Sequence, residues 1–251
     1  CALPIWVIEQ VFYEVDSVQR TEAVARILGH YRPESALIFC NTKIECQEVA
    51  DALAGRGYAA LAIHGDLDQR ERDRVLVLFA NRSASVLVAT DVAARGLDIK
   101  ELSAVINYEL SRNPEVHTHR IGRTGRAGER GLAVSLVTPR ESRLIAAIAD
   151  VPGSSIARGD LSTLAPLPAK PPLPPMVTLC IDGGRKNKLR PGDILGALTG
   201  EGGMPASEVG KIEVFDFLTY VAIARQSSDQ ALNFLRGHRI KGRFFKVRKA
   251  V

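Results

Sequence analysis

The feature that most constrains the fold is an alternation, through the first 150 residues, of short apolar runs with longer segments of helical periodicity. The runs are too short for helices and have no polar face, as expected of strands that are buried on both sides. They lie at residues 36–40, 59–63, 86–89, 104–107 and 132–137. Helices are expected at residues 43–54, 69–80, 115–122 and 140–149. The pattern predicts an α/β domain, with helices on both faces of a parallel sheet.

The alternation stops at Pro152, and a proline-rich stretch follows. Proline cannot donate a backbone hydrogen bond and interrupts helices, so closely spaced prolines favour an extended segment. The prolines concerned are Pro166, Pro168, Pro171, Pro172, Pro174 and Pro175. We therefore predict a first domain at residues 1–151, a linker at 152–175 and a second domain at 176–251.

The second domain has the pattern of a small sheet backed by helices. Strands are expected at residues 177–181, 209–215, 220–224 and 244–248, and helices at 191–198 and 228–236. The resulting order, β-α-β-β-α-β, is typical of ferredoxin-like four-stranded sheets. No apolar run reaches the ~18 residues of a membrane span, so we expect no membrane partner.

Charge is distributed unevenly between the two domains. Residues 1–150 contain 18 Lys and Arg against 20 Asp and Glu, whereas residues 151–251 contain 15 against 8. The basic excess is concentrated at residues 185–190 and 241–249. Clustered cations favour a surface that faces phosphates, although a solvated basic face without a partner would have the same composition. We expect the second domain to bind nucleic acid.

Two loops of the first domain carry groups suited to phosphate. One loop spans residues 90–98, and the other, residues 119–128, places Arg123 and Arg126 among glycines. Glycine lets the backbone approach a ligand closely, and guanidinium is a bidentate, permanently charged donor. Doubly wound sheets bind ligands at the carboxyl ends of their strands, where both loops are expected. Spacing alone leaves open the alternative of a solvated basic helix end.

Together these loops resemble motifs V and VI of the DEAD-box RNA helicases, in the same order and at the usual separation. Residues 37–42 are similar to motif IV of that family, and residues 64–72 are similar to the segment with its Gln-x-x-Arg element, here Gln69 and Arg72. The resemblance covers residues 1–151. It implies a RecA-like lobe, followed here by a smaller domain similar to an RNA recognition motif.

The resemblance also implies roles for individual residues of this lobe. Arg126 matches the arginine finger that neutralises charge on the γ-phosphate, with Arg123 beside it. Asp98 matches the carboxylate that accepts a ribose hydroxyl, and Gly96 belongs to the same nucleotide-binding loop. The positions that face the RNA backbone, or hold the loops that do, are Thr42, Gly65, Gln69, Arg72, Thr90 and Asp91. Such contacts select RNA by its shape and 2′-hydroxyl groups.

His119 begins the second loop, and His117 lies two residues before it. His119 matches a family residue that links the ATP-binding and RNA-binding loops. A metal site at His117 and His119 is not expected, because the sequence offers no third ligand at a suitable spacing. We therefore predict no metal site in the chain.

Motifs of the family's first lobe do not occur in this sequence. It contains neither the Gly-x-x-x-x-Gly-Lys-[Ser/Thr] phosphate loop nor the Asp-Glu-Ala-Asp tetrad that would hold Mg²⁺. The sequence starts at Cys1 rather than Met, as expected of the carboxy-terminal portion of a longer protein. The complete protein is expected to use ATP with Mg²⁺ and to carry the first lobe in cis. This portion alone is expected neither to bind nor to hydrolyse ATP.

The second domain resembles an RNA recognition motif that has lost most of its base-stacking aromatics. Tyr220 stands at a stacking position on the third strand, and Thr178 occupies the position expected for an aromatic on the first. The alternative for Tyr220 is a packed sheet residue. We expect RNA contacts from Tyr220 and from basic residues of the loops and edge strand, namely Arg185, Lys186, Lys188, Lys241, Arg243, Lys246 and Arg248.

Residues 178–186, 190–200, 210–212 and 240–243 closely resemble the tail of one bacterial subfamily, the DbpA helicases. This resemblance implies a cytoplasmic RNA helicase that its tail tethers to a hairpin of 23S ribosomal RNA and that acts in assembly of the large ribosomal subunit. One alternative is an rRNA-binding scaffold with a vestigial motor lobe, against which intact Arg123, Arg126 and Asp98 argue. Another is a DNA helicase of the same superfamily, which the RNA-recognition tail disfavours.

Overall fold

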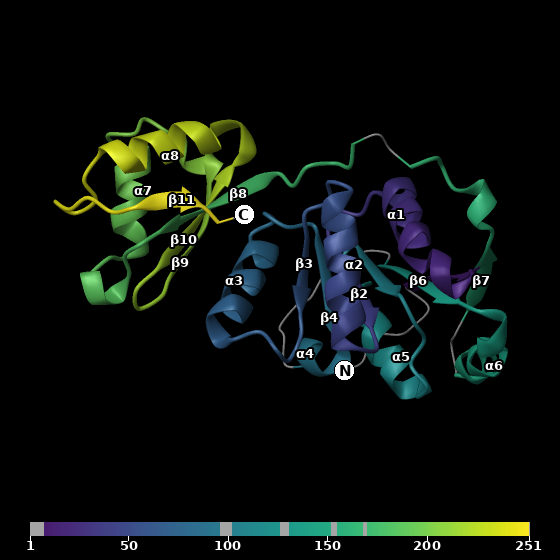
Figure 1. The fold of residues 1–251 in the computed structure, drawn as a ribbon. Helices are drawn as coiled ribbons and strands as arrows, with labels where there is room; N and C mark the ends of the chain where they lie inside the picture. The colour runs from purple at the N-terminus through teal and green to yellow at the C-terminus, as the bar shows by residue number, and fades with distance from the viewer. Residues whose placement is uncertain (1–7, 96–101, 126–130, 152–154, 168–169, 251) are drawn as a thin grey trace. The chain divides into compact units, whose positions relative to one another are not determined.

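The computed structural model describes residues 8–95, 102–125, 131–151, 155–167 and 170–250 (Figure 1). By its internal contacts the chain divides into two compact units. The first comprises residues 1–72 and 85–173, and the second comprises residues 73–84 and 174–251. Each unit contains one β-sheet.

The first unit is built around a parallel seven-stranded sheet in the order β3-β4-β2-β5-β6-β1-β7. Its strands are β1 Ile8–Glu14, β2 Ala36–Cys40, β3 Ala60–Ile63, β4 Val86–Thr90, β5 Ala104–Asn107, β6 Gly131–Val137 and β7 Ile156–Gly159. The central strand β2 is buried at every residue, as expected of a strand covered on both faces. The predicted α/β class and the predicted strands corresponding to β2–β6 are confirmed.

Strands β1 and β7 go beyond the sequence prediction. β1 pairs with β6 on one side and with β7 on the other, where Tyr13 lies opposite Gly159. A Cβ atom at Gly159 would come within 2.4 Å of the Tyr13 ring, so only glycine fits there. β7 lies inside the range predicted as linker, and Leu164, a few residues later, is buried. β7 is a partly exposed edge strand with few apolar residues, so the sequence shows no clear strand pattern there.

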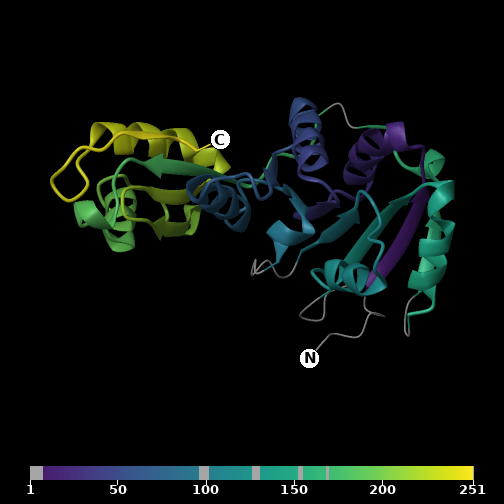
Figure 2. The ribbon, with the colours of Figure 1, turned by 60° about the horizontal axis from the view of Figure 1, so that its bottom comes forward.

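Helices cover both faces of this sheet. They are α1 Arg20–Tyr31, α2 Lys43–Gly55, α4 Asp91–Ala94, α5 Pro114–Ile121 and α6 Ser142–Ala149, with 3-10 turns η2 Ser17–Gln19, η3 Pro139–Glu141 and η4 Leu161–Thr163. Helix α3, Gln69–Ala80, begins in this unit and belongs to the second unit from Asp73 on. Successive residues of β1 project to opposite faces of the sheet and enter different cores. Val11 packs in the cluster that includes α1 and α2, and Phe12 packs with Ile148 of α6. In Figure 2, α1 and α2 lie above the sheet and α5 lies below it. Within the described residues, no helix has the length and apolar character to cross a membrane.

The tail, residues 174–251, contains an antiparallel four-stranded sheet in the order β11-β8-β10-β9. Its main elements are β8 Met176–Ile181, α7 Pro191–Thr199, β9 Val209–Val214, β10 Thr219–Ala224, α8 Ser228–Gly237 and β11 Val247–Lys249, and its 3-10 turns are η5 Arg185–Asn187, η6 Ala206–Glu208 and η7 Arg225–Ser227. Alternate strand residues, such as Leu179 and Val221, join Ile194 of α7 and Leu235 of α8 in one core. The predicted β-α-β-β-α-β domain is confirmed.

The last strand is shorter than predicted. The sequence pattern placed it at residues 244–248, but β11 begins at Val247 and ends at Lys249. The preceding residues run beside β8, since the Asp182 amide donates to the Lys246 carbonyl over 2.9 Å. They do not form a ladder because a tight turn at residues 240–243 redirects the chain just before them.

His117 makes the stability of the first unit dependent on pH. The ring is 1% exposed, and its Nε2 lies 3.2 Å from Gln10 Oε1. Burial, and then the positive charge of Arg120, lower its pKa to about 4. Because the unfolded chain takes up this proton near pH 6.5, the unfolded state gains stability as pH falls from about 6.5 towards 4. His117 alone should therefore lower the free energy of unfolding by about 2 kcal/mol between pH 7 and pH 5.

Chemical denaturation of His117→Gln at both pH values measures this effect. The variant should lose less stability between the two pH values than the wild type does. His119→Gln is the matched control, because it removes an exposed imidazole from the same helix. Equal pH dependence of wild type and His117→Gln would show that His117 does not remain neutral in the folded state.

Candidate nucleic-acid interface

The loops that follow the parallel strands meet at one edge of the sheet. β3, β4, β2 and β5 are consecutive neighbours in the sheet, so their carboxyl ends lie side by side. The residues that follow these ends are His64 and Gly65 after β3, Asp91 after β4, Asn41 and Thr42 after β2, and Tyr108 and Glu109 after β5. The predicted motif IV, motif V and Gln-x-x-Arg segments therefore share one edge, where α/β sheets bind ligands.

Arg120 of α5 connects several of these loops from beneath. Its side chain is 1% exposed and binds Asp91 through two parallel contacts, Nε to Oδ1 and Nη2 to Oδ2, both 2.7 Å. Nη2 also donates to Asn41 Oδ1 over 3.0 Å, and Nη1 donates to the Glu109 carbonyl over 2.7 Å. The guanidinium carbon lies 5.0 Å from the centroid of the Phe39 ring. The segments after β2, β4 and β5 are thus bound to one side chain.

This network assigns Asp91 a holding role. Both carboxylate oxygens accept hydrogen bonds from Arg120, so the loop after β4 is fixed by an ion pair whose guanidinium is buried and whose carboxylate is partly exposed. Arg120 lies within the arginine-rich loop of the sequence, yet its spacing from the other arginines did not distinguish it. The available signal is its position three residues after His117, which places both on the buried face of α5.

Thr42 and Thr90 begin the helices at this edge. Thr42 Oγ1 accepts from the Glu45 amide over 3.2 Å and donates to the Glu45 carboxylate over 2.8 Å, so its hydroxyl caps α2. Thr90 Oγ1 accepts from the Ala93 amide over 3.4 Å at the start of α4. Both threonines, predicted to face RNA or hold the loops that do, set the direction of their loops by capping.

The segment after β3 offers an open backbone. Gly65 lies in the turn, and a Cβ atom placed there would have no protein atom within 4 Å. A ligand could therefore approach the Gly65 backbone closely. Gln69, the first residue of α3, is exposed. Arg72 donates from Nη2 to the Ala93 carbonyl over 2.8 Å, which connects α3 to α4.

The residues predicted to meet ATP are described only in part. Arg123 lies in the turn after α5, where its amide donates to the Arg120 carbonyl over 3.2 Å. Arg126, Asp98 and Gly96 lie outside the described residues, and their roles remain predictions. Of the two histidines considered for a metal, His117 is buried beside Gln10 and His119 is exposed, and the described residues contain no group suited to a metal ion.

The basic residues of the tail differ in how far their charge is already balanced. Arg185 lies 3.8 Å from Asp216, Arg248 pairs with Asp182, and Lys241 lies 3.4 Å from Asp193. The Lys241 ammonium also donates to the Lys188 carbonyl over 3.0 Å, so it connects two loops of the tail. Among the basic residues predicted to contact RNA, those that are exposed and have no ion pair within the described residues are Lys186, Lys188, Arg243 and Lys246.

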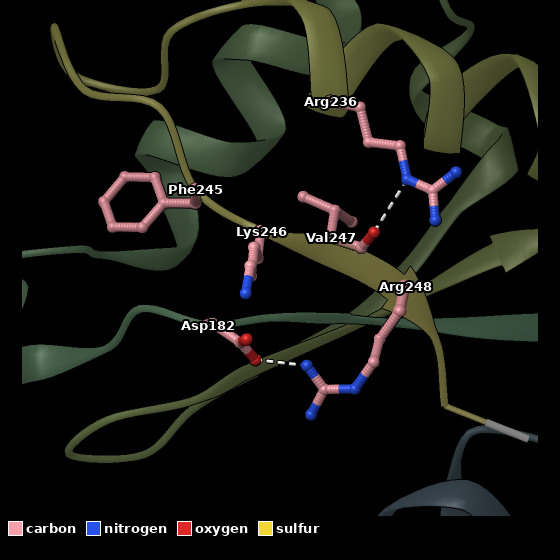
Figure 3. Close-up of a pocket in the computed structure, with 6 residues that line it drawn as sticks. All are labelled: Asp182, Arg236, Phe245, Lys246, Val247 and Arg248. Carbon is pink, nitrogen blue, oxygen red and sulfur yellow. Dashed lines mark hydrogen bonds and ion pairs between the residues drawn. The ribbon is translucent and has the colours of Figure 1, made fainter.

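A pocket of about 400 Å³ lies beside the last strand of the tail. In Figure 3, Arg248 of this strand and Lys246, just before it, point towards Asp182. Arg236 reaches the strand from α8 and donates to the Val247 carbonyl over 2.8 Å. Three cations against one carboxylate leave an excess of positive charge around the pocket. Anionic ligands are therefore favoured there.

Tyr220 is a packed residue of the sheet. It is 6% exposed, its ring meets the Phe215 ring edge-on with centroids 5.8 Å apart, and burial raises the pKa of its hydroxyl. A base could stack on this ring only if the residues that cover it moved away. Base stacking on Tyr220 therefore remains a prediction that the described packing does not favour.

The Arg120–Asp91 pair generates a stability prediction. Removing one partner of a buried ion pair typically costs about 3–5 kcal/mol, because the other charge is left unpaired. Asp91→Leu should reduce the free energy of unfolding by that amount, because it leaves the buried guanidinium unpaired, and Arg120→Leu should cost less, because the Asp91 carboxylate that it leaves is 28% exposed. Arg120→Leu with Asp91→Leu should cost less than the two single changes together. Lys43→Met, which breaks the exposed pair with Asp66, is the control and should have little effect. Additive losses in urea denaturation would contradict a coupled pair.

Comparison with known proteins matches both parts of the chain to families. Residues 19–128 match the helicase conserved C-terminal domain, and residues 178–249 match the DbpA RNA binding domain. The ATP-dependent RNA helicase DbpA of Escherichia coli (strain K12) is 50% identical over 244 residues, which cover 96% of this chain and 52% of that protein. DbpA of Bacillus subtilis (strain 168) is 34% identical over 263 residues, which cover 97% of this chain and 55% of that protein. The chain thus spans about half the length of both relatives.

Solved structures agree with these matches. A DEAD box protein from the hyperthermophile Methanococcus jannaschii has 42% sequence identity and a TM-score of 0.58, over 63% of this chain and 43% of that one. The C-terminal domain of the DEAD-box protein Dbp5 has 30% identity and a TM-score of 0.59, over 63% of this chain and 93% of that one. The chain therefore belongs to the DEAD-box RNA helicases, as a C-terminal RecA-like lobe joined to a DbpA-type RNA-binding domain.

Proposed function

We propose that this chain is the carboxy-terminal portion of an RNA-dependent ATPase that separates short RNA duplexes. The observation that carries the proposal is the network in which Arg120 binds Asn41 and Asp91 at the ligand edge of the sheet. Loops fixed to one another in this way would meet an RNA strand as a unit. The names of the relatives, which are ATP-dependent RNA helicases, support the same activity.

In this mechanism the lobe binds the backbone of RNA through the loops at that edge. Gly65 offers an unobstructed backbone, and Thr42 and Thr90 orient the loops that begin α2 and α4. Contacts of this type read phosphate and sugar rather than base sequence. Asp91 would hold its loop through its bond to Arg120. It would not contact the RNA backbone itself, because a carboxylate repels a phosphate.

ATP with Mg²⁺ would be bound jointly with a first lobe. The share of this chain would be Arg123 and Arg126 towards the phosphates, and Asp98 and Gly96 towards the ribose. Guanidinium groups suit the charge of a polyphosphate, and they hold its oxygens without themselves titrating. Hydrolysis of bound ATP supplies the free energy for releasing the separated strand.

The tail would place the enzyme on its substrate. We infer that it binds a hairpin of 23S ribosomal RNA in the assembling large subunit, in the cytoplasm. The match to the DbpA RNA binding domain and the exposed cations Lys186, Lys188 and Lys246 support RNA binding. An rRNA-binding scaffold without motor activity is the alternative, and ATPase measurements distinguish the two.

The chain alone should show negligible ATPase activity, since its sequence lacks the phosphate loop. Joined to a DEAD-box first lobe, it should hydrolyse ATP when RNA is added, and Arg126→Ala should lower kcat by ~10³ or more with hairpin affinity nearly unchanged. Arg56→Ala is the control, because Arg56 follows α2 at its far end and should leave kcat unaltered. A joined enzyme without RNA-stimulated turnover would favour the scaffold, and full turnover of Arg126→Ala would refute the finger assignment.

The tail's salt dependence should distinguish Lys246 from Arg248. Arg248 is partly neutralised by Asp182 before RNA binds, whereas Lys246 has no ion-pair partner among the described residues. In titrations with a 23S rRNA hairpin at several KCl concentrations, Lys246→Ala should reduce the slope of log affinity against log salt by about one unit. Arg248→Ala should reduce it less.

Lys211→Ala provides the control for these titrations. Lys211 lies on β9, at the opposite edge of the sheet, and pairs with Glu213. Its removal should leave the slope unchanged. A similar change in all three variants would indicate diffuse attraction rather than an RNA surface along the β11 edge.

A further inference from the structure

The segment between α8 and β11 contains a tight two-residue turn. Ile240 and Arg243 exchange backbone hydrogen bonds of 2.8 and 3.1 Å. The two residues between them, Lys241 and Gly242, have φ angles of 52° and 77°. Positive φ at both central positions is characteristic of a type I′ turn, which suits the natural twist of a hairpin.

This turn brings Arg239 and Phe244 together on the surface. In an antiparallel hairpin, the residues flanking a paired position form the next cross-strand pair and project to one face. Arg239 and Phe244 flank Ile240 and Arg243, and the Arg239 guanidinium carbon lies 5.3 Å from the Phe244 ring centroid. Ile240 projects into the tail core and is 1% exposed. The core thus anchors the turn, and the aromatic–guanidinium pair lies outside it.

A second contact holds the tip of the turn in place. The Lys241 ammonium donates to the Lys188 carbonyl over 3.0 Å and approaches Asp193, which caps the start of α7. The turn that carries Arg239 and Phe244 is therefore held in place before any ligand binds. Preorganisation of this kind reduces the entropy lost on binding.

Exposure alone would not make Phe244 functional, because single exposed apolar side chains are ordinary on protein surfaces. The tail itself offers the comparison: Phe244 is 61% exposed and Phe217 is 63% exposed. Phe217 follows an acidic residue, Asp216, whereas Phe244 follows Arg243 and has Arg239 over its ring. Of these two exposed rings, Phe244 is the one with a guanidinium over it.

We propose that the Phe244 ring, backed by Arg239, is a stacking platform for one unpaired base of the RNA that the tail binds. This inference rests on the proposed RNA-binding function of the tail. The base would stack on the face of the Phe244 ring opposite the Arg239 guanidinium, so that stacking on one face is combined with cation–π attraction on the other. Lys246, two residues further along and on the wall of the pocket, would meet a phosphate next to that base (Figure 3).

The platform selects unpaired nucleotides by a simple physical criterion. A base inside a duplex has neighbours on both faces, whereas a base in a hairpin loop has a face free to stack on an aromatic ring. The platform would therefore direct the tail to the loop of a hairpin rather than to its stem. Such stacking also explains how the tail could bind bases although Tyr220 is buried.

The test compares two RNAs with the whole chain. One is a hairpin with a single-stranded loop, and the other is a blunt duplex with the same number of nucleotides. Phe244→Ala should weaken hairpin binding about 5- to 150-fold, the range for loss of one stacked base, and leave duplex binding and the salt slope unchanged. Phe244→Trp should retain hairpin affinity, and Phe217→Ala should behave as wild type.

The outcomes separate this inference from the proposed function. Unchanged hairpin affinity in Phe244→Ala, or an equal loss on both RNAs, would overturn the platform while RNA binding by the tail stands. Wild-type chain that binds neither RNA would overturn both. Phe244 lies outside the core, so the melting temperature of each variant should match wild type, and Phe244→Trp tests stacking independently of any loss of structure in Phe244→Ala.

Discussion

Burying a guanidinium beneath the ligand edge of a sheet costs free energy unless its donors find partners. Arg120 meets this condition with Asp91, Asn41 and the Glu109 carbonyl, which come from three different loops. The same contacts that satisfy the charge therefore fix the loops relative to one another. The arrangement of the lobe's candidate RNA surface depends on this one side chain. The loop positions proposed for Thr42 and Thr90 presuppose it, because these threonines adjoin Asn41 and Asp91.

The tail achieves a comparable effect with a turn rather than a buried charge. Positive φ at Lys241 and Gly242 closes the hairpin, and Ile240 anchors it in the core. Charge and aromatic surface are then arranged by the pairing of the two arms. Lys241, expected from the sequence to contact RNA, also has a structural part, because its ammonium binds the loop that carries Lys188. The basic cluster of the sequence is thus divided between residues that shape the surface and residues that remain open to a ligand.

Much of the lobe follows from local sequence, because its central strands are apolar on both faces. β2 and β4 are of this type, and the loops after them carry recognisable motifs. β7 does not follow from local sequence, since it exists through pairing with β1 and has only one apolar residue facing the sheet's helices. The contacts of Arg120 were not predicted, because the spacing of the arginines alone does not say which one is buried.

In the tail, the sheet and helices followed from the alternation of residue types, but the functional surface did not. Tyr220 has the residue type and strand position of a stacking aromatic, yet packing buries it. Phe244 was expected within a strand, whereas the turn before it leaves its ring in solvent. Exposure depends on how the chain folds back on itself, which single residues do not encode.

Hydrogen–deuterium exchange of Arg120→Gln against wild type tests most directly whether one side chain fixes the ligand edge. If it does, exchange should be faster at residues 41–46 and 91–95 together, although about 50 residues separate these segments in the sequence. Exchange in α8 of the tail should be unchanged. Faster exchange confined to α5, with both loops as protected as in wild type, would contradict the account.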